Sequence, residues 1–342
     1  MEAIYNFSEK DLKDKFTSND FPAYIARQVF EWVYGKRVQD FDLMSNLSKE
    51  VKGFLNENFS ISKLSLVKKE KSSDKTEKFL FKLEDDSAIE AVLIPEDARS
   101  TLCVSTQVGC KFKCLFCASG ENGFKRNLTA GEIIGQYLVV SGLEASPKIT
   151  NIVFMGIGEP LDNFENTIKS INILMNSAGI NFSKRRISIS TCGLVPEIKK
   201  LAKLKLGIKL SVSLHSADND IRSKLMPINK KYPLEELIPA LREFSKASRG
   251  LVTFECVLIP GINTSREDAK SLAKLLNRFN GKANLIPYNG VSSEFKAPTQ
   301  EEIDIFSQEL KTRGVFFTLR KSRGQDINAA CGQLRAKYLL EK

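Results

Sequence analysis

The chain has 342 residues, of which 42% are hydrophobic and 27% are charged, a composition typical of a globular protein and not of a disordered or fibrous one. No apolar run approaches the ~20 residues that a membrane-spanning helix needs, and the amino terminus lacks the basic start and apolar stretch of a secretory signal. We therefore expect a cytoplasmic protein without membrane association, whose seven cysteines are metal ligands, redox groups or core residues and not a disulfide framework.

Lysine and arginine outnumber aspartate and glutamate by 51 to 41, which gives a formal net charge of +10. A positive field favours phosphate-bearing partners and speeds their encounter. The charge alone is equally compatible with scattered lysines that only maintain solubility. The basic stretches lie at residues 68–71, 184–186, 199–200, 230–231 and 320–323.

Hydrophobic periodicity divides the chain into three parts. Residues 1–60 predict a helical unit, because apolar residues recur three and four positions apart. Residues 61–95 change to short alternating runs, which predict the strands of a small β-rich connector. Residues 96–342 alternate between strand-like and helix-like segments and form the main domain. Its expected strands lie near 101–106, 151–156, 186–191, 209–214, 251–260, 283–288 and 315–320, and its expected helices near 129–141, 164–176, 195–205, 233–247, 266–278 and 299–313.

This alternation predicts the fold class. Six strand–helix units imply parallel strands joined by right-handed crossovers. Six units are fewer than the eight of a closed barrel, so we expect an α/β fold with a partial (β/α)6 barrel, a helical N-terminal domain and a short β extension. Two helix starts are marked by the capping-box spacing, Thr129 with Glu132 and Thr299 with Glu302.

Three cysteines fall in one short loop after the first expected barrel strand. Cys110, Cys114 and Cys117 have the spacing Cys-x3-Cys-x2-Cys. A cubane iron–sulfur cluster normally takes four thiolates, so three closely spaced ligands leave one iron open to a substrate. The pattern therefore indicates a cluster with an open coordination position.

Zinc is the rival interpretation of the cysteine loop. A structural zinc site needs four closed ligands, usually two separated pairs. The only histidine, His215, lies far along the chain, so the fourth ligand would have to be Cys103 or Cys331. A zinc-dependent RNA-binding protein without catalysis stays open as an alternative. Cys192 and Cys256 are interpreted as small core residues.

Polar residues follow several of the expected strands. Ligands of parallel α/β sheets and barrels bind at the carboxyl ends of the strands. Glycine lets the backbone approach a ligand, and a carboxylate accepts a hydrogen bond from an ammonium group. The same residue types also cap turns, so the pattern alone leaves both roles open. The candidates are Gly158, Glu159, Ser190, Ser213, Leu214, His215 and Asn289.

The cysteine loop, with Phe116 beside its last cysteine, and the Gly-Glu-Pro sequence at 158–160 resemble the radical S-adenosylmethionine (SAM) superfamily. The resemblance implies that SAM binds the open iron through its amino and carboxylate groups. It further implies a [4Fe–4S] cluster on Cys110, Cys114 and Cys117, with Gly158 and Glu159 against the SAM amino group. With SAM as the ligand, the candidates for contacts to its ribose, adenine and carboxylate are Ser190, Ser213, Leu214, His215 and Asn289.

Three longer segments, 101–110, 226–232 and 329–334, are similar to the RlmN/Cfr family of RNA adenine methyltransferases, and the similarity runs over nearly the whole chain. Pro160 and Pro287 are typical of the branch that methylates adenine C2. The branch that methylates C8 and confers antibiotic resistance remains an alternative. The resemblance implies action on adenine 2503 of 23S rRNA and adenine 37 of tRNA, an electron donor such as flavodoxin with its reductase, and a monomer.

The resemblance also gives roles to residues outside the cysteine loop. Adenine C2 is electron-poor and cannot attack the SAM methyl group as an ordinary nucleophile. By resemblance, Cys331 takes a methyl group from one of two SAM molecules and carries it to C2, and Cys103 releases the product through a transient Cys103–Cys331 disulfide. Glu90 is a candidate general acid or base, although a lone glutamate on an edge strand is commonly solvated. We expect Arg185 and Arg186 to contact RNA phosphates.

Overall fold

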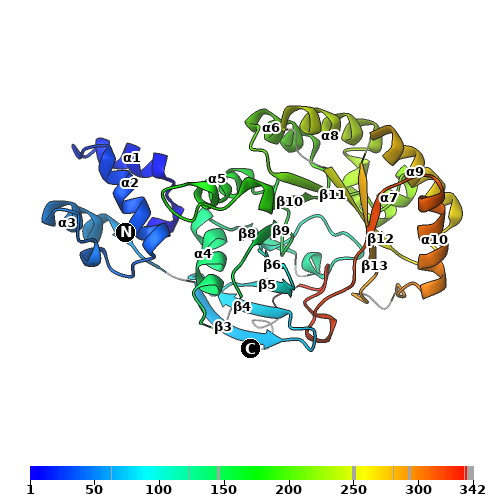
Figure 1. Cartoon of the computed structure of the whole chain (residues 1–342), viewed down its shortest axis with the longest axis horizontal. Helices are drawn as coiled ribbons and strands as arrows, with labels where there is room; N and C mark the ends of the chain where they lie inside the picture. The colour runs from blue at the N-terminus through cyan, green and yellow to red at the C-terminus, as the bar shows by residue number, and fades with distance from the viewer. Residues whose placement is uncertain are drawn as a thin grey trace.

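A computed structural model of the protein describes residues 1–62, 64–121, 123–144, 147–248, 252–279, 281–291, 294–334 and 336. Its centre is one curved sheet of ten strands, in the order β14-β13-β12-β11-β10-β9-β6-β5-β4-β3 (Figure 1). The first seven in this order are mutually parallel, which confirms the α/β class. They are β6 (Arg99–Cys103), β9 (Asn151–Phe154), β10 (Ile187–Thr191), β11 (Lys209–Ser213), β12 (Val252–Leu258), β13 (Lys282–Pro287) and β14 (Phe317–Leu319).

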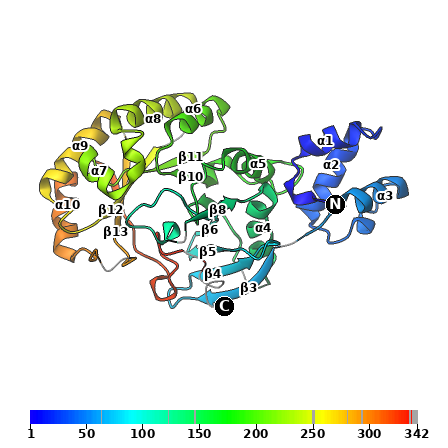
Figure 2. The same ribbon diagram turned by 180° about the vertical axis from the view of Figure 1, so that it is seen from behind.

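Helices connect the parallel strands and cover the outside of the curved sheet. Figure 2 shows α6, α8, α9 and α10 as an arc around the strands, which leaves the barrel open. The two expected capping boxes are confirmed at the first turns of α4 and α10. Only α7 was not expected from the sequence. The helices are α4 (Ala130–Ser141), α5 (Phe164–Met175), α6 (Val195–Leu204), α7 (Asn219–Leu225), α8 (Leu234–Ser248), α9 (Arg266–Phe279) and α10 (Gln300–Thr312).

Three antiparallel strands extend the same sheet at its other end: β3 (Ser65–Lys71), β4 (Glu77–Lys82) and β5 (Ala88–Glu96). They correspond to the expected short β extension, and they do not form a separate sheet. The reason is that β5 pairs directly with β6, with Val92 opposite Cys103 and Leu93 opposite Leu102. The extension is therefore part of the barrel wall next to the first parallel strand.

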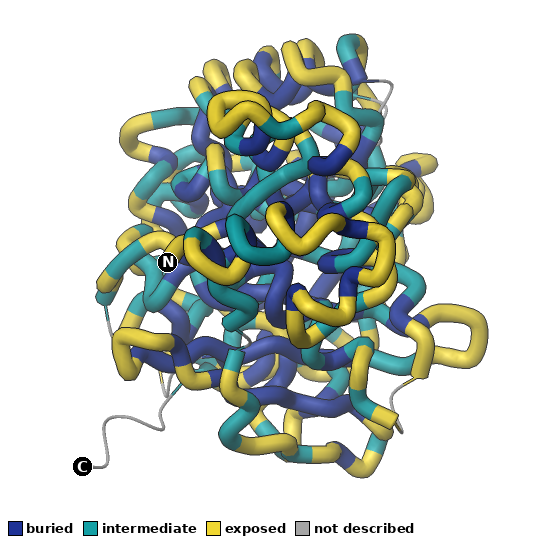
Figure 3. Tube along the Cα trace, turned by 90° about the vertical axis from the view of Figure 1, so that its left-hand side faces the viewer, coloured by how far each residue is buried: buried dark blue, intermediate teal, exposed yellow. Residues whose placement is uncertain are grey.

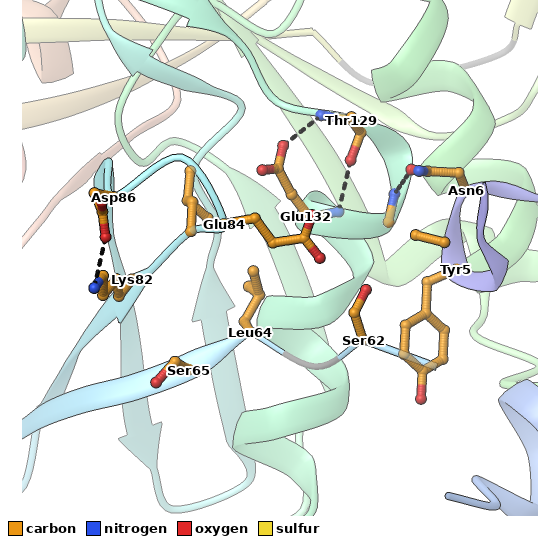
Figure 4. Close-up of a pocket in the computed structure, with 13 residues that line it drawn as sticks. Tyr5, Asn6, Ser62, Leu64, Ser65, Lys82, Glu84, Asp86, Thr129 and Glu132 are labelled. Carbon is orange, nitrogen blue, oxygen red and sulfur yellow. Dashed lines mark hydrogen bonds and ion pairs between the residues drawn. The ribbon is translucent and has the colours of Figure 1, made fainter. Parts of the chain in front are cut away.

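The amino-terminal part is helical, as expected, with α1 (Glu9–Thr17), α2 (Tyr24–Phe30) and α3 (Lys49–Asn58). It contacts the barrel at α4, where Gly131 N–H donates to Asn6 Oδ1 at 2.8 Å and Arg37 donates to Ser141 Oγ at 2.9 Å. A cavity of about 440 Å³ lies at this junction, between Tyr5, the β4–β5 turn and the start of α4 (Figure 4). None of the site residues expected from the sequence lines it.

The main core lies between the curved sheet and the helices that cover it. Buried segments occupy the middle of the molecule and exposed ones its periphery (Figure 3). Phe154, Ile189, Val212 and Phe254, one from each of β9–β12, are fully buried. Three of these are followed directly by Ser190, Ser213 and Glu255, which line the cavity on the opposite face of the sheet. In the described ranges, no helix is both long and apolar enough to cross a membrane.

Candidate active site

A cavity of about 160 Å³ opens at the carboxyl ends of the parallel strands, where a barrel of this type binds its ligands. Most of the residues expected from the sequence meet there, although they come from five different strands or loops. Its lining includes Cys110, Cys114, Phe116, Cys117, Met155, Gly156, Gly158, Glu159, Ser190, Cys192, Ser213, His215, Glu255, Arg320 and Cys331.

The cysteine loop is shaped by a short hairpin of β7 (Gln107–Gly109) and β8 (Phe124–Asn127). Gly109 has φ +75°, and a Cβ there would lie 1.8 Å from the Gly123 carbonyl oxygen, so no larger residue fits. Cys110 N–H donates to that same oxygen at 3.0 Å, and Cys117 N–H donates to Cys114 O at 3.1 Å. The hairpin and the tight turn together hold the three thiols over the cavity.

The three thiols suit a polynuclear cluster. Burial raises the pKa of Cys114, the neighbouring Cys117 and Cys110 raise it further, and burial raises the pKa of Cys110 to about 12. The thiols therefore ionise together only around a cationic centre. In the part of the chain that the structure describes, no three His, Cys, Asp or Glu side chains converge on one metal-ion position. Cys110, Cys114 and Cys117 nevertheless line one cavity, and cysteine thiolates are the ligands that hold iron–sulfur clusters.

Glu159 lies on the wall beside the cysteines and is 5% exposed. Its Oε2 accepts from Cys192 N–H at 2.7 Å and its Oε1 from Leu161 N–H at 3.1 Å. Burial raises the pKa of Glu159, while these backbone donors lower it. Gly158 has φ +102°, and a Cβ there would lie 2.5 Å from the Gln107 side chain. The turn can thus place the carboxylate against a cationic ligand group.

His215 faces the same cavity with an unused donor. Its Nδ1 accepts from Val257 N–H at 3.0 Å, so the neutral ring carries its proton on Nε2. Burial lowers the pKa of His215 to about 3, so the ring is neutral at physiological pH. Within the described structure Nε2 has no hydrogen-bond partner, and the ring packs on Phe116 at a centroid distance of 4.2 Å. A buried donor of this kind needs an acceptor from a ligand.

Two of the expected SAM contacts lie elsewhere. Leu214 is fully buried in the core and is not part of the cavity lining, although its backbone N–H bonds to Glu255 O at 3.0 Å. Asn289 is also outside the lining. Its Nδ2 donates to Cys331 O at 3.2 Å, and its Oδ1 accepts from Gln325 at 2.9 Å and from Ser322 Oγ. In this structure Asn289 therefore holds the segment that carries Cys331.

The segment from Ser322 to Leu334, here called the Cys331 segment, is fixed from two sides. On one side the β3–β4 hairpin binds it: Ser72 Oγ, in the turn, donates to Asp326 at 2.6 Å, and Lys78 Nζ, on β4, donates to Ile327 O at 2.5 Å. On the other side the cysteine loop binds it, because Ala118 N–H donates to Gly332 O at 2.7 Å. Cys331 lies between these attachments and is exposed.

Cys103 and Cys331 meet at a second, smaller cavity of about 50 Å³. Cys103, on β6, is buried and packs with Ala329 and Leu334 of the Cys331 segment. Burial raises the pKa of Cys103 to about 12, the nearby Cys331 raises it further, and Arg320 lowers it. Both cysteines are free thiols. Because Cys331 also lines the larger cavity, one thiol faces both spaces.

Glu90 is buried and lies on β5 between two other strands, not on a solvated edge. Its Oε2 accepts from Ala336 N–H at 3.0 Å, and its Oε1 is 3.7 Å from Lys78 Nζ. It lines neither cavity that contains Cys331. The structure therefore places Glu90 next to Ala336, just beyond the end of the Cys331 segment. Its role in proton transfer stays a prediction.

Sequence reasoning missed three residues of the cavity. Glu255 was detectable as a lone charge in the apolar strand β12, and its Oε2 accepts from Asn284 at 2.6 Å. Arg320 lines both cavities, and Cys331 is the largest cause that raises its pKa. Cys192 is buried, as expected for a core residue, but it also lines the cavity. Arg185, by contrast, is exposed in a turn before the amino end of β10, opposite the site.

Comparison with known proteins places this site in a family. The model of the radical SAM superfamily matches residues 104–276, and that of the ribosomal RNA large subunit methyltransferase N-terminal domain matches residues 3–61. A probable dual-specificity RNA methyltransferase RlmN of Clostridium novyi is 44% identical over 341 residues, covering 99% of each chain. The chain belongs to the RlmN family of radical SAM RNA methyltransferases.

Other RlmN relatives agree over the full length. The dual-specificity RNA methyltransferase RlmN of Syntrophotalea carbinolica is 44% identical, covering 98% of this chain and 90% of its own. A crystal structure of a radical SAM methyltransferase from Sphaerobacter thermophilus is 43% identical, with a TM-score of 0.91 over 98% of this chain and 100% of that chain. Membership in the RlmN family excludes the non-catalytic zinc protein and confirms the partial radical SAM barrel.

Proposed function

We propose that this RlmN-family chain methylates C2 of adenine 2503 in 23S rRNA and of adenine 37 in tRNA, with two SAM molecules per turnover. The observation that carries the proposal is the place of Cys331, which lines both the cavity of the three cluster cysteines and the small cavity of Cys103. One exposed thiol can thus reach a SAM molecule and then a second cysteine.

Cys110, Cys114 and Cys117 are the residues that would hold the [4Fe–4S] cluster. When bound, the cluster supplies one electron that cleaves SAM into methionine and a 5′-deoxyadenosyl radical. Glu159 accepts from the SAM ammonium group, and the free Nε2–H of His215 donates to an acceptor of SAM. Gly158, Ser190 and Ser213 border the same space. Leu214 would contact SAM through its backbone, and Asn289 would affect SAM binding through the Cys331 segment that it holds.

The thiolate of Cys331 first attacks the methyl carbon of one SAM and takes the methyl group, and S-adenosylhomocysteine leaves. The 5′-deoxyadenosyl radical removes one hydrogen atom from this S-methyl group and becomes 5′-deoxyadenosine, and the resulting carbon radical adds to adenine C2. The adduct loses the C2 proton with the help of Cys103 and would return one electron to the oxidised cluster. Cys103 then attacks Sγ of Cys331, the bond from that sulfur to the transferred carbon breaks, and the carbon takes up a proton. The product is 2-methyladenosine with a Cys103–Cys331 disulfide, which an external dithiol must reduce.

Arg320 is well placed to support the thiol chemistry, because it lines both cavities and its charge lowers the pKa of Cys103. Glu90 supports the same chemistry by holding the chain at Ala336, just beyond the Cys331 segment. The protein would work as a cytoplasmic monomer with an electron donor such as flavodoxin and its reductase.

The helical part, residues 1–60, would bind folded RNA together with the connector, residues 61–95, and the barrel, residues 96–342. At the cysteine loop, Phe124 is 40% exposed and the ammonium group of Lys111 lies 5.7 Å from its ring centroid. An exposed ring beside lysines suits a base that is splayed out of the RNA.

The test is the product formed on 23S rRNA and tRNA by the anaerobically reconstituted protein with SAM and a reductant. Mass spectrometry against synthetic standards should show 2-methyladenosine, and none with Cys331→Ala. Formation of 8-methyladenosine would place the chain in the C8 branch instead. No methylation by a protein with an intact, reducible cluster would refute the proposed substrate.

A further inference from the structure

Arg222, on α7, has an exposed fraction of 0% and is one of the largest fully buried side chains of the protein. Its Nη1 donates to Asn229 Oδ1 at 2.5 Å, and its Nη2 donates to Cys192 O at 2.8 Å and to Ser213 O at 3.2 Å. All three acceptors are neutral. Nε has no partner among the residues that the structure describes.

The charge of Arg222 is therefore buried without a matching carboxylate. No ion pair of Arg222 exists within the described ranges. Burial lowers the pKa of Arg222 to about 10, which still leaves it protonated at neutral pH. Removing an ion from water costs several kcal/mol, and buried cations are accordingly paired with an anion. The described residues offer this charge three neutral acceptors and no anion.

The surroundings of Arg222 point to the cluster cavity. Nη2 of Arg222 donates to the carbonyl oxygen of Cys192. Cys192 and the cluster cysteine Cys114 line the same cavity. A Cβ at Gly193 would lie 3.1 Å from Nη2, so glycine keeps this approach open. The end of α7 is fixed to the cysteine loop, since Leu115 N–H donates to Leu225 O at 3.0 Å. Burial lowers the pKa of Arg222, and the charged forms of Cys192 and Cys114 act in the opposite direction and raise it.

We infer that Arg222 is the buried counter-charge of the iron–sulfur cluster and raises its reduction potential. The three thiolates make the bound cluster anionic, and reduction adds one more negative charge. A fixed cation behind the cluster wall stabilises the reduced form more than the oxidised form, because Coulomb energy grows with charge and is weakly screened in a buried site. The inference rests on the cluster of the proposed function and needs no RNA.

The experiment is a redox titration of the cluster, followed by electron paramagnetic resonance, in the anaerobic full-length protein without RNA. Arg222→Gln retains a side-chain donor but loses the charge, and Arg222→Met loses both. Both should shift the midpoint potential to more negative values by similar amounts, while Arg222→Lys should remain close to the wild type. Arg37→Gln is the matched control, since Arg37 also donates to neutral oxygens, of Ser141 and Tyr137, but at the contact of the helical unit with α4.

Asn229→Asp is a second way to remove the net positive charge, and it leaves Arg222 in place. A carboxylate next to Nη1 neutralises the cation, so the potential should fall as it does in Arg222→Gln. If Arg222→Gln and Arg222→Met lose the cluster, the midpoint potential of Asn229→Asp tests the inference in their place.

Iron and sulfide contents are measured for every variant. An unchanged potential in Arg222→Gln and Asn229→Asp with full cluster content would overturn the inference. So would a shift in Arg222→Met without a shift in Arg222→Gln, because the potential would then follow the hydrogen bond and not the charge. Absence of a cluster in the wild type itself would instead refute the proposed function.

Discussion

Replacing Glu159 by Gln tests the SAM site at the residue whose geometry is most restricted. The carboxylate accepts two backbone N–H groups, at 2.7 Å from Cys192 and 3.1 Å from Leu161. Gln offers one acceptor for these two donors and has no charge for the SAM ammonium group. A hydrogen bond to a charged group contributes about 1.5–3 kcal/mol. The Kd for SAM should therefore rise roughly 10- to 150-fold.

The assay is equilibrium binding of SAM to the anaerobic, cluster-loaded protein in the absence of RNA. The ligand 5′-methylthioadenosine lacks the amino acid part of SAM, so it should bind the wild type and Glu159→Gln equally. This comparison separates loss of one contact from damage to the cavity. A Kd for SAM within about twofold of the wild type would refute the assignment of Glu159 to the ammonium group.

Three further predictions concern the chemistry and stability of the site. A pKa of about 12 leaves Cys103 with roughly a thousandfold less thiolate than an ordinary cysteine, so iodoacetamide should modify it far more slowly than the exposed Cys331; equal rates by peptide mass spectrometry would contradict the buried position. Asn289→Ala removes three side-chain hydrogen bonds to the Cys331 segment, worth about 0.5–1.5 kcal/mol each, so single-turnover methylation of Cys331 should slow at least about tenfold; weaker SAM binding with normal Cys331 methylation would instead support the direct SAM contact. Because the pKa of His215 falls from 6.5 to about 3 on folding, the unfolded chain binds the proton first, and stability should decrease as the pH falls through this window, by up to about 1.4 kcal/mol per pH unit. Urea unfolding of His215→Asn should lose this part of the acid sensitivity, and an unchanged pH profile would show that the ring is not buried neutral.

Local patterns predicted the barrel well because each parallel strand and its helix are specified within a short stretch of sequence. The capping box at Thr129 and Glu132 is a local device, and both reciprocal hydrogen bonds form. The place of the β3–β5 strands depends instead on which neighbour β5 pairs with, and this pairing is decided by tertiary contacts. Alternation within 61–95 predicts strands but does not contain that information.

In the candidate site, too, locally specified features were predictable from the sequence and features decided by tertiary contacts were not. Cys110, Cys114 and Cys117 were predictable because their spacing is itself the signal. Asn289 was predicted as a SAM contact from its position after a strand, but its side chain holds the Cys331 segment, more than thirty residues away in sequence. Arg222 gave no signal, because a single arginine near a helix end is ordinarily solvated, and only the packing of α7 shows that it is buried.

The most direct test of the central claim, that the methyl carbon passes through Cys331, is an isotope count. The wild-type protein is given SAM with a fully deuterated methyl group under single-turnover conditions, and the methylated adenosine is analysed by mass spectrometry. Passage through Cys331 removes one deuterium as an atom and adds one proton at release, so the product should carry two deuterium atoms in its methyl group. A product with three would mean that the intact methyl group moves from SAM to the adenine, and would contradict the account.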